Sequence, residues 1–257
     1  IILTATASAS NKSYDATTTA AGSDLSSFDA LQGGETLSMS GSGTAASKDV
    51  ANNISMSNNG NLALVDGTGL ASNYSLNLTI INITTKSVDL SGTKIYDANT
   101  TLDNSIVSIS SGLVGSETLT LTGEVNTNNA NAGSYSASGG TLNNATTTIA
   151  LANGSNGGLA ANYAINDGAF TITQKAISLS GTRLYDATTD AVASDLTTIS
   201  GRVGTETLTL SGTGSVADAN VDPNKTVTVG TLALGDGTGL AANYTLSGGT
   251  HQLTVDQ

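Results

Sequence analysis

The sequence predicts an all-β protein built from three tandem copies of one small module. The first observation is a motif, Tyr-Asp-Ala followed by Thr or Asn, which begins at Tyr14, Tyr96 and Tyr185 and so recurs about every 85 residues. The second is that short stretches alternate apolar and polar residues between clusters of Gly, Asn, Ser and Asp, as half-buried strands do. The third is that apolar residues at helical spacing are nearly absent.

Two further motifs recur in the same order within each copy. One is Glu-Thr-Leu close behind a glycine, and the other is Gly-Leu-Ala-x-Asn-Tyr. Three motifs in constant order indicate a structural repeat, because each module needs the same residues at the same places in its fold. The repeated residues are Tyr14, Asp15, Glu35, Asn73 and Tyr74 in the first copy, Tyr96, Asp97, Glu117, Asn162 and Tyr163 in the second, and Tyr185, Asp186, Glu206, Asn243 and Tyr244 in the third.

The motif positions also set the module boundaries. Ile1 precedes Tyr14 by the same number of residues as Ile83 precedes Tyr96, and Ile83 ends a predicted strand. We therefore interpret residues 1–3 as the tail of an upstream copy, which makes the chain an excerpt of a longer array. The predicted modules are residues 1–85, 86–174 and 175–257.

The joints between the predicted modules lack flexible linkers. Alternation of apolar and polar residues continues across residues 171–179 and nearly so across 81–88. A flexible joint would be rich in Gly and Ser over several residues. We therefore expect a strand to pass directly from one module into the next and to produce an extended rod.

Two all-β folds fit a module of this size. The first expectation is an Ig-like sandwich, because short alternating strands are separated by frequent turn residues. The alternative is a β-grasp fold, which requires a helix across the sheet. Residues 23–31, in which Leu25, Phe28 and Leu31 are spaced by three, and residues 195–199 could form that helix.

Composition excludes several classes of function. The net charge is −12 with only eight Lys and Arg residues, which argues against nucleic acid and against anionic membrane surfaces as partners. No apolar run is long enough for a transmembrane helix. One His, no Cys and no phosphate-binding glycine loop leave no recognisable catalytic or zinc motif. We expect no enzyme activity and no cofactor.

The tyrosines and aspartates of the motifs have structural and functional interpretations. Six of the seven tyrosines lie in repeated motifs, so we expect each to anchor a core with its hydroxyl bonded to backbone. Stacking on a sugar is the alternative. The Asp after each motif tyrosine suits an Asx-type turn. Calcium binding is the alternative for the acidic residues, with Asp66 and Asp236 as candidates, but the middle copy has no matching carboxylate. We predict no metal site.

Together, the Tyr-Asp-Ala-Thr-Thr, Gly-x-Glu-Thr-Leu and Gly-Leu-Ala-x-Asn-Tyr motifs resemble the YDG/MBG-type repeats. Such repeats occur in filamentous-haemagglutinin-like adhesins of Gram-negative bacteria, which are exported by two-partner secretion. The resemblance extends over essentially the whole chain. It departs at Ala16, Ala98 and Ala187, where the family usually has Gly, and at Arg183, which replaces Lys.

The resemblance implies a secreted structural segment at the bacterial cell surface. We expect a non-catalytic stalk whose partners are further copies of the module in the parent chain. The alternatives are that the modules bind host or matrix glycans, or that the chain is a subunit of an extracellular filament. Neither nucleic acid nor membrane insertion is expected.

Overall fold

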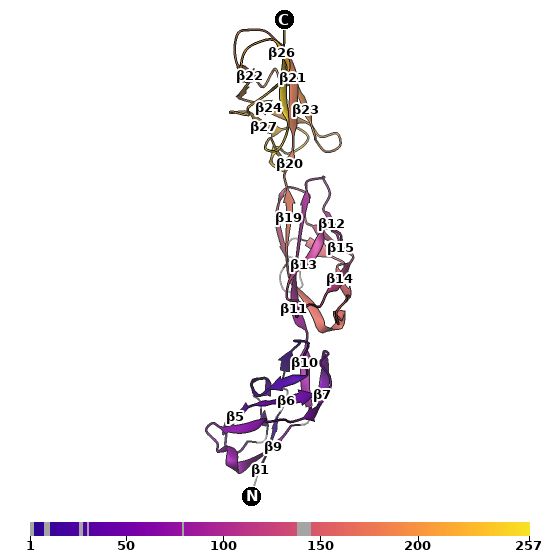
Figure 1. The fold of residues 1–257 in the computed structure, drawn as a ribbon, viewed down its shortest axis with the longest axis vertical. Helices are drawn as coiled ribbons and strands as arrows, with labels where there is room; N and C mark the ends of the chain where they lie inside the picture. The colour runs from indigo at the N-terminus through magenta and orange to yellow at the C-terminus, as the bar shows by residue number, and fades with distance from the viewer. Residues whose placement is uncertain (1–2, 8–10, 26–27, 30, 79, 138–144) are drawn as a thin grey trace. The chain divides into compact units, whose positions relative to one another are not determined.

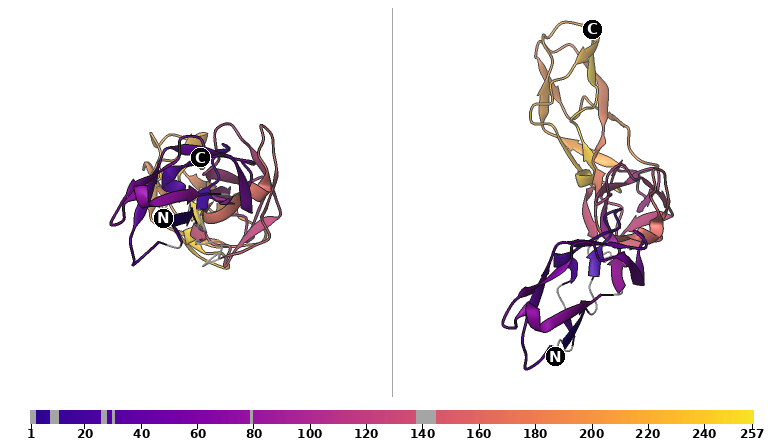
Figure 2. Two further views of the ribbon diagram at one scale, coloured as in Figure 1. Left: turned by 90° about the horizontal axis from the view of Figure 1, so that it is seen from below. Right: turned by 60° about the horizontal axis from the view of Figure 1, so that its bottom comes forward.

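The computed structural model describes residues 3–7, 11–25, 28–29, 31–78, 80–137 and 145–257. Throughout these residues the regular elements are β-strands, with four 3-10 helices of three or four residues (Figure 1, Figure 2). None of the described residues is α-helical, and no helix among them is long and apolar enough to cross a membrane. The predicted all-β class is confirmed.

Contacts divide the chain into two compact units. Unit 1 comprises Ile1–Leu90, Ile109–Thr122 and Ala150–Asp167, and unit 2 comprises Ser91–Ser108, Gly123–Ile149 and Gly168–Gln257. Three strands contribute residues to both units. They are β11 (Lys86–Ile95), β13 (Val107–Ser111) and β19 (Tyr163–Thr173).

Unit 1 contains the strands of the first predicted module and a strand pair from the second. The further elements of unit 1 are β1 (Leu3–Ala7), β2 (Asn11–Ser13), β3 (Thr19–Ala21), η1 (Gly22–Leu25), β4 (Phe28–Asp29), β5 (Leu37–Ser40), β6 (Ser42–Ala45), β7 (Ala51–Asn58), β8 (Ala63–Asp66), η2 (Ala71–Asn73), β9 (Tyr74–Asn77), β10 (Ile80–Thr84), β14 (Leu119–Thr122), β18 (Ala150–Asn153) and η3 (Ala160–Asn162). Its sheets have the strand orders β4-β1-β9, β2-β10-β7-β6-β3, β5-β8 and β14-β18.

Unit 2 contains the third predicted module and the remaining strands of the second. The further elements of unit 2 are β12 (Thr101–Asp103), β15 (Glu124–Thr127), β16 (Gly133–Ala137), β17 (Ala145–Thr147), β20 (Lys175–Ala176), β21 (Ser178–Leu184), β22 (Asp190–Val192), β23 (Thr198–Ser200), β24 (Leu208–Ser211), β25 (Thr213–Ser215), β26 (Asp222–Thr226), β27 (Ala233–Asp236), η4 (Ala241–Asn243), β28 (Tyr244–Thr245) and β29 (His251–Asp256). Its sheets include β23-β21-β29-β26, β12-β15-β17, β22-β25, β24-β27 and β20-β28, and the sheet β13-β11-β19-β16 contains the three strands that both units share.

The same strand pairings occur three times, which supports tandem β modules. The strand that follows the Glu-Thr motif pairs antiparallel with a later strand in β5–β8, β14–β18 and β24–β27. A second antiparallel pair recurs as β3–β6, β12–β15 and β22–β25. The first and last strands of a repeat lie parallel, as β21 and β29 do with Leu179 opposite His251. Leu3 belongs to such a pair, opposite Tyr74, whereas Ile1 and Ile2 lie outside the described residues.

Alternation along the strands decides which side chains enter the core. In β11, Val88, Leu90 and Lys94 face inward, whereas Ile95 faces solvent. The core of unit 1 includes Tyr14, Leu25, Ile81 and Ile83. In unit 2, the largest fully buried side chains include Leu102, Phe170, Ile172, Leu179, Leu196 and Leu253. Each such side chain contributes about 1.5–3 kcal/mol through burial.

The predicted helix segments are not helical in the way that a β-grasp fold requires. Residues 22–25 form the 3-10 helix η1, and Phe28–Asp29 is a short strand, while residues 26–27 and 30 lie outside the described part. Residues 193–195 form a turn, and the next strand begins at Thr198. One helical turn with apolar residues at every third position cannot cover a sheet, so the β-grasp alternative has no support among the described residues.

The prediction of an uninterrupted strand across each joint is wrong: the strand breaks at Thr85 in the first joint and at Gln174 and Ile177 in the second. β10 ends at Thr84 and β11 begins at Lys86, and β19 ends at Thr173 before β20 begins at Lys175. The reason is a change of partners: β10 pairs with β2 and β7, whereas β11 belongs to the sheet that contains β13 and β19. The connection is nevertheless only one residue long.

Candidate functional site

The three motif tyrosines occupy one position in the fold, at the end of the parallel pairing with the last strand of a repeat. Each backbone N–H donates to a carbonyl of that last strand, because the register of the two strands brings them together. The bonds run from Tyr14 N to Thr84 O (2.9 Å), from Tyr96 N to Thr173 O (2.8 Å) and from Tyr185 N to Asp256 O (2.8 Å).

The aspartate after each tyrosine closes a tight turn. Asp15 Oδ1 accepts the backbone N–H of Thr17 at 2.9 Å, which is the hydrogen bond of an Asx-type turn. Ala16 between them has φ 61°, in the left-handed region. Burial alone would raise the pKa of Asp15, but hydrogen bonds from Lys12 and Thr17 outweigh it and hold that pKa below its ordinary value.

A buried basic residue two positions before each tyrosine donates hydrogen bonds to the backbone of the turn. Lys12 is only 4% exposed, and its Nζ donates to Thr17 O at 2.7 Å and pairs with Asp15 at 2.7 Å. Lys94 repeats this arrangement with the carbonyl of Asn99 at 2.6 Å. Arg183 does so with the carbonyl of Asp190 at 2.6 Å. This role was not predicted from the sequence, although the fixed spacing of a cation from each tyrosine is a signal that could have indicated it.

In unit 1, two tyrosines and a glutamate from distant parts of the chain meet in a buried cluster. Tyr14 Oη donates to Glu117 Oε1 at 2.7 Å, and Tyr163 Oη donates to Glu117 Oε2 at 2.6 Å. The two rings lie edge to face with centroids 5.4 Å apart. Val114 N–H donates to Tyr163 Oη at 3.1 Å, and Lys48 Nζ donates to Tyr14 Oη at 3.2 Å. One carboxylate thus joins the motif of one repeat to the second tyrosine of the next.

The same cluster recurs in unit 2. Tyr96 Oη donates to Glu206 Oε1 at 2.7 Å, and Tyr244 Oη donates to Glu206 Oε2 at 2.5 Å. The ring centroids are 5.3 Å apart with an interplanar angle of 79°. Val203 N–H donates to Tyr244 Oη at 2.9 Å. Agreement of two independent copies indicates that the repeated residues encode this geometry.

The asparagine before the second tyrosine completes each cluster. Asn162 is 1% exposed, accepts the backbone N–H of Val50 at 2.9 Å and donates to Asp49 at 2.9 Å. Asn243 accepts the N–H of Ala132 at 2.8 Å and donates to Asn131 at 3.0 Å. The two loops that receive these bonds follow β6 and β15. An amide can supply both bonds at once, because it carries an acceptor and a donor.

The clusters keep their phenols protonated. Burial and the hydrogen bond to Glu117 raise the pKa of Tyr163 to about 12. Burial and the bond to Glu206 raise the pKa of Tyr96 to about 12. An ionised phenol would face the negative carboxylate at hydrogen-bond distance, so the neutral donor is favoured.

Two of the repeated tyrosines lie in incomplete copies of the cluster. Tyr74 Oη donates to Glu35 Oε2 at 2.6 Å and accepts the N–H of Gln32 at 3.0 Å, but among the described residues no motif tyrosine bonds Glu35 Oε1. Tyr185 is 52% exposed. The prediction that the motif tyrosines all anchor a core is therefore wrong for Tyr185. In the two complete clusters, the glutamate and the second tyrosine that cover the motif tyrosine come from the following repeat.

Asp66 and Asp236 have a local role in the fold. Asp66 Oδ1 accepts the N–H of Ala71 at 2.6 Å, and Asp236 Oδ1 accepts that of Ala241 at 2.7 Å, at the start of the 3-10 helices. Asn153 does the same for Ala160 at 2.8 Å. An amide oxygen suffices for this bond, which explains the missing carboxylate in the middle repeat. Within the described residues, no three His, Cys, Asp or Glu side chains gather as a metal site would require.

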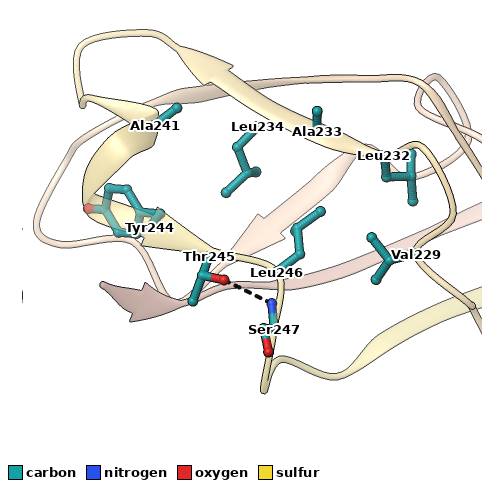
Figure 3. Close-up of a pocket in the computed structure, with 9 residues that line it drawn as sticks. All are labelled: Val229, Leu232, Ala233, Leu234, Ala241, Tyr244, Thr245, Leu246 and Ser247. Atoms are coloured by element: carbon teal, nitrogen blue, oxygen red, sulfur yellow. Dashed lines mark hydrogen bonds between the residues drawn. The ribbon is translucent and has the colours of Figure 1, made fainter. Parts of the chain in front are cut away.

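A shallow pocket lies beside Tyr244 in the third repeat. Its wall includes Leu232, Leu234 and Leu246, and Figure 3 shows Leu234 and Leu246 between Val229 and Tyr244. The Tyr244 hydroxyl points away from the leucines (Figure 3) and is bonded to Glu206. Tyr244 is only 2% exposed, so its ring is not available as a flat platform for a sugar.

Comparison with known protein families gives one result. The model of the YDG domain matches residues 2–81 and again residues 169–252. No curated protein and no solved structure shows significant similarity. The two matched segments cover more than half of the sequence and contain the complete motif sets of the first and third repeats. The chain therefore belongs to the YDG domain family.

Proposed function

We propose that the chain is a non-catalytic stalk segment of a large, secreted bacterial surface adhesin. Its modules act as spacers, and its partners in the parent protein are further copies of the same module. The location is the exterior of a Gram-negative bacterium.

The observation that carries this proposal is the buried tyrosine–glutamate cluster. In each unit the cluster joins residues of two successive repeats, and one residue connects their strands. A one-residue connection and a buried hydrogen-bonded contact both resist bending, because either motion would expose and unpair polar groups. A spacer needs that resistance, and it needs no catalytic group.

Solution scattering tests the spacer function. A compact globule of this length has a radius of gyration of about 18 Å, whereas three modules in line give about 30 Å. We expect the larger value for the wild type and a smaller, broader distribution for Tyr96→Ala, which removes one cluster. Tyr185→Ala is the matched control, because Tyr185 has no partner tyrosine or glutamate among the described residues. A wild-type value near 18 Å contradicts the stalk.

Glycan binding is the second candidate function, and the exposed ring of Tyr185 favours it. Exposed aromatic rings are the usual platforms for sugars, and Tyr185 is the motif tyrosine with an open face. A glycan array probed with the wild type and with Tyr185→Ala distinguishes the two functions. Binding that the substitution abolishes supports adhesive modules rather than a spacer.

For each module we propose an Ig-like sandwich. Two packed sheets need two sets of strands. The third repeat has the mixed sheet β23-β21-β29-β26 and the antiparallel pairs β22–β25 and β24–β27, and such pairs recur in each repeat. An experimental structure of the third repeat tests this arrangement. Two face-to-face sheets with the buried Leu179, Leu196 and Leu253 between them are expected.

A further inference from the structure

The first and last strands of a repeat lie side by side and run in the same direction. In the third repeat these strands are β21 and β29, whose parallel register runs from Leu179 opposite His251 to Leu184 opposite Asp256. A shorter parallel pair, β20 with β28, precedes it. The first repeat has the same arrangement, since β1 pairs parallel with β9 and β2 with β10. The chain therefore enters and leaves such a repeat along neighbouring parallel strands.

Parallel pairing decides how a pull on the chain acts on the hydrogen bonds of the repeat. The chain enters β21 at the N-terminal end of that strand and leaves β29 at its C-terminal end. In a parallel pair these two points lie at opposite ends of the ladder. Tension therefore slides one strand along the other and strains all the bonds between them at once. Strands that are pulled apart from one end break their bonds one after another, which needs less force.

The bonds between β21 and β29 lie in the middle of a sheet. The N–H of Leu179 donates to Thr250 O at 3.1 Å at one end of the pair, and the N–H of Tyr185 donates to Asp256 O at 2.8 Å at the other. β23 and β26 flank the two strands, so β21 and β29 are the central strands of their sheet. Leu253, which faces inward from β29, is 0% exposed. Hydrogen bonds that are shielded in this way open less readily than bonds at an edge.

We propose that the parallel pair β21–β29 is a mechanical clamp, which carries tension along the chain and keeps the rest of its repeat folded. Residues 185–250 lie between the two strands in sequence and include Glu206 and Tyr244 of the joint cluster. Tension reaches these residues only after the clamp yields, because the bonds between β21 and β29 carry it first. The inference deepens the proposed spacer function, since a spacer in an adhesin transmits the pull on whatever the adhesin holds.

Single-molecule pulling on the full chain in two directions tests the clamp. The chain has no cysteine, so two introduced cysteines define where the force is applied. Gln174→Cys with Gln257→Cys pulls β21 and β29 at opposite ends and shears them. Leu184→Cys with Gln257→Cys pulls them at neighbouring ends and separates them from there, since Leu184 lies opposite Asp256. We expect the third repeat to open at a several-fold higher force in the shearing direction.

Two controls assign the difference in force to the direction of pulling. The length released on opening identifies the third repeat, because each unfolded residue between the two anchors adds about 3.5 Å. Urea denaturation should give both double variants the midpoint of the wild type, since all three replaced side chains are exposed. Equal opening forces in the two directions would overturn the proposal.

A matched pair of substitutions tests one bond of the clamp. Tyr185→Pro removes the N–H that donates to Asp256 O, whereas Tyr185→Ala loses the same ring and keeps that N–H. Under a constant shearing force the proline variant should open about fivefold faster than the alanine variant, which is the effect of one backbone hydrogen bond. Equal opening rates in the two variants would contradict the clamp.

The clamp and the spacer function can fail separately. A compact radius of gyration together with an opening force that depends on direction would reject the spacer and support the clamp. An extended radius of gyration with the same opening force in both directions would support the spacer and reject the clamp.

Discussion

A carboxylate that accepts hydrogen bonds from two phenols is the chemical centre of each joint. Glu117 and Glu206 each use both oxygens in this way, at 2.5–2.7 Å. Hydrogen bonds to a charged acceptor contribute about 1.5–3 kcal/mol each, and leaving such a group unpaired costs a similar amount. The stability of a joint therefore depends strongly on one residue.

Glu117→Gln should lower the free energy of unfolding by about 1–3 kcal/mol. The amide keeps one acceptor oxygen, so either Tyr14 or Tyr163 loses its partner. Urea denaturation measures the effect. Glu35→Gln is the matched control, since among the described residues Glu35 accepts a side-chain bond from Tyr74 alone and one oxygen suffices for it. Equal losses in the two variants would show that the second phenol adds nothing.

High pH should loosen the joints. The ordinary tyrosine pKa is 10.0, and the folded protein raises the pKa of Tyr96 and Tyr163 to about 12. Below pH 10 both the folded and unfolded states hold the proton. Between pH 10 and 12 the unfolded state loses it first, so the free energy of unfolding falls as pH rises, on the order of 2 kcal/mol per tyrosine.

Urea denaturation across this pH range, with tyrosinate absorbance recorded in parallel, measures the loss. Tyr163→Phe removes one of the phenols whose pKa is raised and should show a shallower pH dependence than the wild type. A variant with an unchanged slope would assign the pH dependence to other groups.

The alanine in the motif turn is strained. Ala98 has φ 61°, and a residue with a Cβ loses about 1–2 kcal/mol in this region. Ala98→Gly should relieve this strain, offset in part by the greater freedom of glycine in the unfolded chain, and so stabilise by about 0.5–1 kcal/mol. Thermal denaturation measures the gain. Ala71→Gly, in a 3-10 helix without positive φ, should destabilise instead.

At the scale of elements, strands were predictable and their partners were not. The alternation around Leu37 and Met39 predicted a strand, and β5 lies there with both side chains buried. The helix that the alternative β-grasp fold would place over residues 23–31 is not found among the described residues, because the three-residue spacing of the apolar side chains suits a 3-10 turn and a short strand equally well. The local pattern of apolar residues distinguishes a helix from a strand only when the pattern extends over many residues.

The joint clusters were beyond sequence reasoning because their members are far apart in the chain. The repeats singled out Tyr14, Glu117 and Tyr163 as constant residues, yet nothing local shows that a glutamate 103 positions away accepts the hydroxyl of Tyr14. The motifs suggested a separate role for each residue within its own module. In fact the constant residues meet across the boundary between modules.

The loop after β6 depends on an asparagine of the next repeat. Asn162→Ala should leave Val50 N–H without an acceptor and speed its hydrogen exchange at least about tenfold, since one hydrogen bond of about 1.4 kcal/mol is lost. Amide exchange followed by NMR measures this residue directly. Asn73→Ala should leave the protection of Val50 unchanged, because the acceptor of the Val50 N–H is Asn162 and not Asn73. Unchanged exchange in both variants would mean that the loop is held by its other contacts.

At the scale of the whole molecule, the sequence repeats and the contacts divide the chain differently. The repeats predict three modules, and these boundaries stay a prediction. The contacts give two units, and they assign Ile109–Thr122 and Ala150–Asp167 of the middle repeat to unit 1. The difference arises because each cluster ties the glutamate and second tyrosine of one repeat to the motif tyrosine of the previous one.

Because every joint is assembled from the same tyrosine, glutamate and asparagine, any repeat can follow any other. An in-frame duplication or deletion of one repeat in the gene would leave each remaining junction with its full set of partners. Length in such a protein can therefore change during evolution in whole steps, without new compensating substitutions at the junctions.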